Sequence, residues 1–254
     1  MIVVVPVDPP RDGLVLASLA ERTPLSESEA RRLYEATTAD VLQTVAASGG
    51  DLLVNYRDEE TLPPDFDGGD PEAEVRSLVD DALTDESASS ARVERQVGST
   101  RSARVGNTVT HLLDREDAAS VGVLEPTAPL VGRTEIDGAA MSIRRHDVVL
   151  GPSSSGRTYF AAFADSIDFD DADTVPELAT LAARAADAGF DTGFAAMFPT
   201  VATEPGLCAT VATLEAQRAA GKVRALETAT VVDELGLRVG DDERLERRET
   251  DNAF

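Results

Sequence analysis

The sequence has few of the side chains from which many functional sites are built. It contains one cysteine, Cys208, and two histidines, so it offers neither an internal disulfide nor the ligand pattern of a zinc site. It has no tryptophan, and aromatic residues make up only 4% of its 254 residues. No apolar run reaches the ~18 residues of a membrane-spanning helix, and the opening MIVVVPVDPP lacks the basic segment of a signal peptide. We therefore expect a cytoplasmic protein without a membrane span.

Lysine is almost absent as well, and the charge is strongly one-sided. Lys222 is the only lysine, and 47 Asp and Glu residues give a formal net charge of -24. Such a surface repels nucleic acid and anionic membranes, so neither is an expected partner. Abundant Asp and Glu with almost no lysine resembles the cytoplasmic proteins of salt-loving archaea, in which the charge is an adaptation to the solvent. The alternative is an acidic surface built for a basic partner.

Strand-like and helix-like segments alternate along the chain. Short β-branched or apolar runs predict strands, and apolar residues at helical spacing predict helices between them. The clearest strands are 2–7, 51–56, 120–125 and 147–152. The clearest helices are 26–48, 71–84, 174–189 and 204–222. This order predicts an α/β fold, with a three-layer, Rossmann-like and mostly parallel sheet of six or seven strands and helices on both faces. We expect one domain over residues 1–238 and a polar acidic tail over 239–254.

Loops at the carboxyl ends of the strands are the expected place for a ligand in such a sheet. One of them, GPSSSGR at 151–157, combines small hydroxyl side chains with an arginine. Hydroxyl groups and one guanidinium can bind an anion. The alternative is a plain turn in which Arg157 is a solvated charge.

Several segments occur in an order that resembles a known family. They are the first strand with its proline loop, RRLYEATTADVLQTV, RQVGSTRSARVGNTV, VGVLEPTAPL, HDVVLGPSSSGRTYFAAF and LETATVVDELGL. Together they resemble an uncharacterised glycosyltransferase-like family of the nucleotide-diphospho-sugar transferase superfamily (GT-A fold). They are more distantly similar to the phospholactate guanylyltransferases of archaea. The resemblance implies a nucleotide over the first half of the sheet. It also implies phosphates held by a metal on an aspartate motif and by basic residues in the first loop.

The sequence departs from that family where charge is expected. The first loop reads DGLVL in place of a polar and basic sequence, which leaves Arg11 beside Asp12 as its only cation. The positions of three expected aspartates are occupied by Thr127, Ser155 and Ala202. A divalent cation prefers carboxylate ligands. We therefore expect Mg or Mn to bind weakly at most, with Glu125 as the best remaining metal ligand.

The resemblance predicts one pocket and leaves two functions open. The predicted nucleotide- or phosphate-binding residues are Arg11, Asp12, Thr127, Ser153, Ser155, Gly156 and Arg157. One hypothesis is a nucleotide-sugar-dependent glycosyltransferase or nucleotidyltransferase, whose partner is a nucleotide or sugar nucleotide. The alternative is a non-catalytic relative that keeps the fold for binding or assembly. If turnover occurs, we expect Glu125→Gln and Arg157→Ala each to lower activity at least tenfold.

Other polar residues are assigned structural roles. His111 is expected to be a partly exposed helix residue, and His146 is expected at the edge of the sheet opposite the pocket. The acidic cluster of Asp168, Asp170, Asp171 and Asp173 could bind a cation. In so acidic a protein, a solvated surface is the favoured interpretation.

Overall fold

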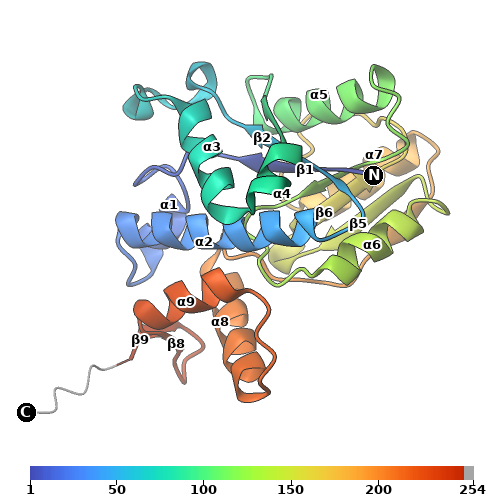
Figure 1. Ribbon diagram of the computed structural model, residues 1–254. Coiled ribbons are helices and arrows are strands. Elements are labelled where there is room, and N and C mark those ends of the chain that lie inside the picture. The colour runs from blue at the N-terminus through green and yellow to red at the C-terminus, as the bar shows by residue number, and fades with distance from the viewer. Residues whose placement is uncertain (249–254) are drawn as a thin grey trace, which may run out of the picture.

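The computed structural model describes residues 1–248 and contains one seven-stranded sheet with the strand order β3-β2-β1-β4-β6-β5-β7 (Figure 1). Its strands are β1 (Ile2–Val7), β2 (Asp51–Tyr56), β3 (Arg92–Arg95), β4 (Val121–Leu124), β5 (Val148–Pro152), β6 (Thr158–Phe163) and β7 (Thr192–Phe194). All strands run parallel to one another except β6, which is antiparallel to β4 and β5. Only residues 153–157 separate β5 from β6, and so short a segment cannot make the crossover that a parallel pair needs. The predicted fold class is confirmed.

Both faces of the sheet are covered by helices because its strands are apolar on both sides. In β1, Val3, Val5 and Val7 belong to one buried cluster, whereas Val4 belongs to another. The first cluster packs against α2 (Glu27–Ala46), α3 (Pro71–Ala82) and α6 (Arg133–Ser142). The second cluster packs against α5 (Arg101–Asp114) and α7 (Glu177–Asp187). Short helices α1 (Ala17–Arg22) and α4 (Asp85–Ser90) complete the layers.

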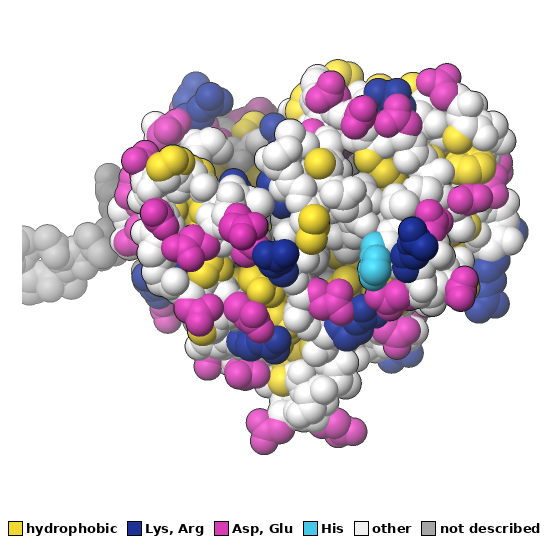
Figure 2. Space-filling view, turned by 90° about the horizontal axis from the view of Figure 1, so that it is seen from above, with side chains coloured by type: hydrophobic (Ala, Val, Ile, Leu, Met, Phe, Trp, Pro, Cys, Tyr) yellow, Lys and Arg dark blue, Asp and Glu magenta, His cyan; other side chains and the backbone are white. Residues whose placement is uncertain are grey.

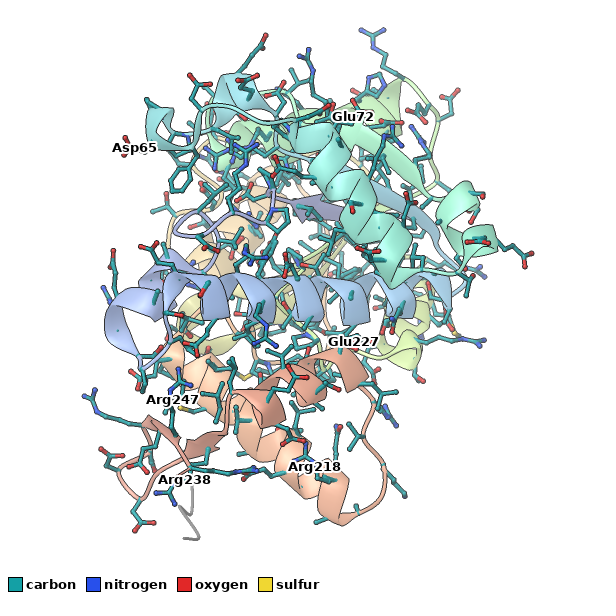
Figure 3. All side chains as sticks on the ribbon, turned by 60° about the vertical axis from the view of Figure 1, so that its left-hand side comes forward. Asp65, Glu72, Arg218, Glu227, Arg238 and Arg247 are labelled. Carbon is teal, nitrogen blue, oxygen red and sulfur yellow. The ribbon has the colours of Figure 1, made fainter. Side chains whose placement is uncertain are left out.

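The C-terminal part forms a unit against the far side of α2 (Figure 1). It comprises α8 (Glu204–Ala219), α9 (Leu226–Glu234) and the antiparallel hairpin of β8 (Leu237–Val239) and β9 (Leu245–Arg247). Its apolar cluster includes Leu207, Leu237 and the buried Leu245, and it continues to Leu19 of α1 and Leu33 of α2. In Figure 3, Glu227 lies beside α2. The region predicted as a polar tail, 239–254, begins at the last residue of β8 and contains β9, whose Leu245 is buried. Residues 249–254 of that tail lie outside the described residues.

Acidic side chains are scattered over the face of the molecule that Figure 2 shows. Asp and Glu side chains are spread over that face among Lys and Arg, and they gather into no single patch. Many arginines form ion pairs with carboxylates on neighbouring elements, such as Arg247 of β9 with Glu29 of α2 at 2.7 Å (Nη2–Oε2). No helix in residues 1–248 combines the length and apolar character needed to cross a membrane.

Candidate functional site

A polar cleft lies at the carboxyl ends of β1, β3 and β4. We call it the edge cleft, and its volume is about 170 Å³. The loop after β1, the start of α5 and the loop after β4 contribute most of its wall. Its lining residues are Pro6, Asp8, Leu14, Val15, Leu16, Tyr34, Gln96, Arg101, Arg104, Glu125, Pro126, Thr127 and Ala202. The cleft is therefore at the edge of the sheet where the strand order predicts a ligand.

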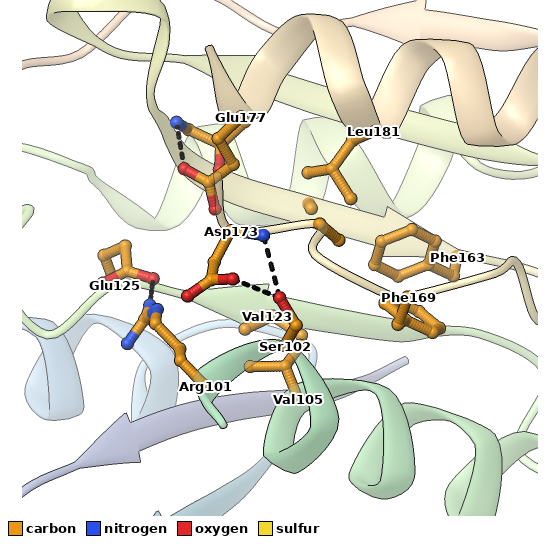
Figure 4. Close-up of a pocket in the computed structure, with 13 residues that line it drawn as sticks. Arg101, Ser102, Val105, Val123, Glu125, Phe163, Phe169, Asp173, Glu177 and Leu181 are labelled. Atoms are coloured by element: carbon orange, nitrogen blue, oxygen red, sulfur yellow. Dashed lines mark hydrogen bonds and ion pairs between the residues drawn. The ribbon is translucent and has the colours of Figure 1, made fainter. Parts of the chain in front are cut away.

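An ion pair between Arg101 and Glu125 divides the edge cleft from a second space behind it (Figure 4). Arg101 is the first residue of α5, after the N-cap Thr100, whose hydroxyl accepts a hydrogen bond from the Ala103 amide at 3.1 Å. Glu125 directly follows β4. Burial raises the pKa of the Glu125 carboxyl, and the charge of Arg101 lowers it in part. The charge of Glu125 in turn raises the pKa of Arg101.

Arg104, one turn further along α5, is buried in the wall of the same cleft. It is 8% exposed, and its Nε donates to Oε1 of Gln96 at 2.7 Å. Gln96 is itself fixed, because its Nε2 donates to the Asn55 carbonyl at 2.6 Å. Burial lowers the pKa of Arg104, and the nearby positive charges of Arg57 and Arg101 lower it further. The start of α5 therefore presents a buried cation at this edge of the sheet.

Gly98 allows the segment between β3 and α5 to approach the first turn of that helix. Its φ is +141°, and a Cβ at this position would lie 2.8 Å from the Arg104 amide nitrogen. A larger residue would therefore push the segment away from the helix. The glycine keeps Gln96 and Arg104 close enough to bond.

The second space, the inner cavity, is small and mostly apolar. Its volume is about 40 Å³, and it lies between α5, α7, β4 and β6. Polar groups gather at its mouth (Figure 4): Asp173 accepts a hydrogen bond from the Ser102 hydroxyl, and Glu177 accepts one from the Thr158 amide at 2.9 Å. The lining residues are Arg101, Ser102, Val105, Val123, Glu125, Thr158, Ala161, Phe163, Phe169, Ala172, Asp173, Glu177 and Leu181.

Comparison with known proteins identifies the fold. No family model matches the sequence, and no curated protein matches it. The chain superposes on a "putative nucleotide-diphospho-sugar transferase" from Desulfovibrio desulfuricans G20 with a TM-score of 0.72 and 18% identity, over 92% of this chain and 94% of that one. The chain has a nucleotide-diphospho-sugar transferase fold.

Two further structures overlap with most of the chain at lower scores. The 4-diphosphocytidyl-2C-methyl-D-erythritol synthase of Anaerococcus prevotii DSM 20548 gives a TM-score of 0.49 at 12% identity, over 84% of this chain and 96% of that one. A cytidylyltransferase from Leptospira borgpetersenii serovar Hardjo-bovis gives 0.48 at 8% identity, over 92% and 93%.

Within this transferase fold, the predicted residues of the first loop are turned away from the edge cleft. Arg11 forms an ion pair with Glu74 at 2.7 Å, and Asp12 forms one with Arg31 at 2.6 Å. Neither side chain lines the edge cleft or the inner cavity. Of the predicted residues, Thr127 lines the edge cleft and Glu125 lies between the two spaces.

The four other predicted residues form the turn between β5 and β6 and line neither space. Ser153 is 4% exposed, its amide donates to the Arg157 carbonyl at 2.8 Å, and its hydroxyl has no partner among the described residues. Ser155 and Gly156 have positive φ angles of 59° and 73°, which turn the chain back into β6. Arg157 is exposed. Phosphate binding by this turn stays a prediction.

The acidic cluster is only in part the solvated surface that the sequence suggests. Asp168 forms an ion pair with Arg184 at the surface, at 2.6 Å. Asp173, in contrast, lies at the mouth of the inner cavity, where its amide donates to the Ser102 hydroxyl at 3.0 Å. The prediction of a solvated surface is wrong for Asp173, because Ser102 of α5 lies beside it and forms hydrogen bonds with it. His146 forms a hydrogen bond with Asp191 (Nδ1–Oδ2 2.6 Å). Both residues lie at the amino ends of β5 and β7, on the side of the sheet opposite the edge cleft.

The side chains of the edge cleft do not fit a divalent cation. Asp8 and Glu125 are its only carboxylates. Glu125 is bound to Arg101, and Asp8 lies 3.9 Å from Arg57 (Oδ2–Nη1). Within residues 1–248, no three His, Cys, Asp or Glu side chains are grouped as a metal site would require. Two guanidiniums in the wall also oppose a cation, so a metal role for Glu125 stays a prediction.

Gln96, Arg101 and Arg104 were not predicted as site residues, although the segment that contains them contributed to the family resemblance. Their position in the sequence could have indicated a role in the site, because a polar segment joins the strand at 92–95 to the helix that follows it. That junction is a carboxyl strand end like the others. The family resemblance implies basic residues in the first loop instead.

Proposed function

We propose that this protein is a transferase that binds a nucleoside phosphate in the edge cleft. The observation that carries the proposal is the gathering of Arg57, Arg101 and Arg104 near one carboxyl edge of the sheet, in a chain whose net charge is -24. Phosphate groups are the ligands that clustered guanidiniums bind best. Proteins that share the fold support the same kind of ligand, because one of them is named for a nucleotide-diphospho-sugar substrate.

Nucleotidyl transfer and glycosyl transfer both require positive groups in the cleft. In nucleotidyl transfer, an acceptor oxygen attacks the α-phosphorus and pyrophosphate leaves. In glycosyl transfer, the acceptor attacks the anomeric carbon and a nucleoside diphosphate leaves. In each case, negative charge grows on the departing phosphate, and fixed positive groups stabilise it. Arg101 and Arg104, which line the edge cleft, are the groups that we propose for this role.

A non-catalytic relative is the second candidate, and a specific observation favours it. Glu125, the best remaining carboxylate for chemistry, is bound to Arg101. Such a protein would bind the nucleotide without turnover. The two candidates differ in product formation and not in binding.

The test is a panel of nucleoside triphosphates and nucleotide sugars, with binding measured by thermal shift and calorimetry in KCl solution. We expect at least one to bind the wild type and to bind Ala202→Leu at least tenfold more weakly, because this variant fills the edge cleft. Ala209→Leu, at an exposed position of α8, is the matched control and should bind normally. Equal binding by Ala202→Leu, or no binding to the wild type, would contradict the proposal. Release of pyrophosphate or nucleoside diphosphate identifies the transferase.

A further inference from the structure

Arg104 carries a buried charge without a counter-charge. No carboxylate of residues 1–248 lies within 4 Å of its guanidinium, although the side chain is 8% exposed. Nε binds Gln96, but the terminal nitrogens Nη1 and Nη2 donate to no described residue. The other arginines that lack a carboxylate at this distance are all exposed: Arg22, Arg115, Arg144, Arg145, Arg157, Arg224 and Arg244. Arg104 is thus the one buried arginine in residues 1–248 without an ion pair.

Such a charge is costly, and it cannot be removed by losing a proton. Arginine stays protonated in proteins, and a charge held largely away from water is unfavourable unless an anion lies beside it. The neighbours make the cost larger, because Arg57 and Arg101 add positive charge and only more distant carboxylates such as Asp8 and Asp173 oppose it. A ligand anion at the terminal nitrogens would offset the cost.

Arg104 is one of the residues that line the edge cleft. Gln96 holds the Nε side of its guanidinium at 2.7 Å, which leaves the two terminal nitrogens available to a ligand in the cleft. Arg101 lines the same cleft from the first position of α5. The positive end of this 14-residue helix adds to their field. A planar guanidinium whose two terminal nitrogens are free offers four N–H donors and matches the oxygens of a phosphate.

We propose that Nη1 and Nη2 of Arg104 bind a phosphate group of the nucleotide directly, beside Arg101 and without a bridging divalent cation. The inference rests on the proposed function and assigns the phosphate contact to the start of α5. It differs from the family pattern, in which the first loop and a metal hold the phosphates. Here Arg11 of that loop is paired with Glu74, and the cleft carboxylates face arginines.

The test is calorimetric titration with inorganic pyrophosphate in the presence of EDTA, at the lowest KCl concentration that keeps the protein folded. We expect the wild type to bind and Arg104→Gln to bind at least tenfold more weakly. Arg115→Gln, at the exposed C-terminal end of the same helix, is the matched control and should bind normally. Arg104→Gln should unfold close to the temperature of the wild type, because removal of the unpaired charge offsets loss of the hydrogen bond to Gln96. If that variant does not fold, Arg104→Lys, which keeps the charge without the planar fork, should also bind more weakly than the wild type.

The outcomes separate this inference from the proposed function. Equal binding of pyrophosphate by the folded Arg104 variants and the wild type would overturn the inference, as would binding that EDTA abolishes. If pyrophosphate binds through Arg104 but no nucleotide binds more tightly than pyrophosphate, the anion site stands and the proposed function fails. If nucleotides bind wild type and Arg104→Gln equally, the anion site fails and the proposed function stands.

Discussion

Asp40 of α2 should be among the most important side chains for the stability of the C-terminal unit. It is 4% exposed, and it accepts hydrogen bonds from the Thr228 amide at 2.8 Å, the Thr228 hydroxyl at 2.6 Å and the Glu227 amide at 3.2 Å. The N-cap residue of α9, Ala225, has no side chain able to cap the helix. Asp40 therefore caps α9 from another helix. Asp40→Ala should loosen the attachment of the unit to α2.

The size of the effect follows from the bonds that are lost. Removing an N-cap costs about 0.5–2 kcal/mol, and leaving a buried polar group unpaired costs about 1–3 kcal/mol. Together they predict a loss of about 2–4 kcal/mol in the free energy of unfolding. For a chain of this size, each kcal/mol lowers the melting temperature by about 2–4 °C, so a decrease of about 5–15 °C is expected.

Thermal and denaturant unfolding in molar KCl measure this loss, with Asp80→Ala on the exposed face of α3 as the control. A variant Asp40→Ala within about 0.5 kcal/mol of the wild type, the range of a surface substitution, would refute the capping role. pH gives a second check. Burial raises the pKa of Asp40 above its ordinary value. The titration of Asp40 therefore contributes stability at pH values below the unfolded-state pKa. This contribution is lost as the pH rises through the folded-state pKa. The advantage of the wild type over Asp40→Asn should shrink over that rise.

Three other predictions concern the net charge, the contact between α5 and Phe169, and the ion pair of Arg101 with Glu125. The melting temperature should rise steeply from dilute to molar KCl because salt screens the net charge of -24, and a flat response would contradict the halophilic interpretation. Gly106→Ala should cost about 1–3 kcal/mol by overpacking, because its Cβ would lie 2.6 Å from Phe169 Cβ. Gly138→Ala in α6, with no atom within 4 Å of the new Cβ, should not destabilise the protein. If turnover is found, Glu125→Gln should lower kcat/KM at least tenfold because Arg101 loses the carboxylate that orients it, and an unchanged value would exclude this positioning role.

The strands and the layer order could be predicted because they depend on local patterns. The runs 2–7 and 51–56 coincide with β1 and β2, since strands buried on both faces are continuously apolar. The hairpin of β8 and β9 could not be recognised, because in GDDERLERRE a single leucine, Leu245, provides the buried contact. Leu245 is buried because α8 and α9 pack around it, and this packing exists only in the folded protein.

The location of the cleft was predictable, but most of its residues were not. Thr127 and Glu125, which directly follow a strand, line the cleft as the sequence suggests, and their role in binding stays a prediction. Arg11 does not line the cleft because it pairs with Glu74, and the sequence does not reveal that pair because the two residues are 63 positions apart. Arg104 looks like any other arginine in the sequence. Its burial and the lack of a carboxylate beside it exist only in the folded protein.

The most direct test is a crystal structure of the protein with the tightest-binding nucleoside phosphate of the panel, grown with EDTA. The proposed function and the anion site predict a phosphate oxygen within hydrogen-bonding distance of Arg104 Nη1 or Nη2, in the edge cleft and beside Arg101. A nucleotide whose phosphates contact Arg11 or Arg157 instead, with Arg104 unoccupied, would contradict them.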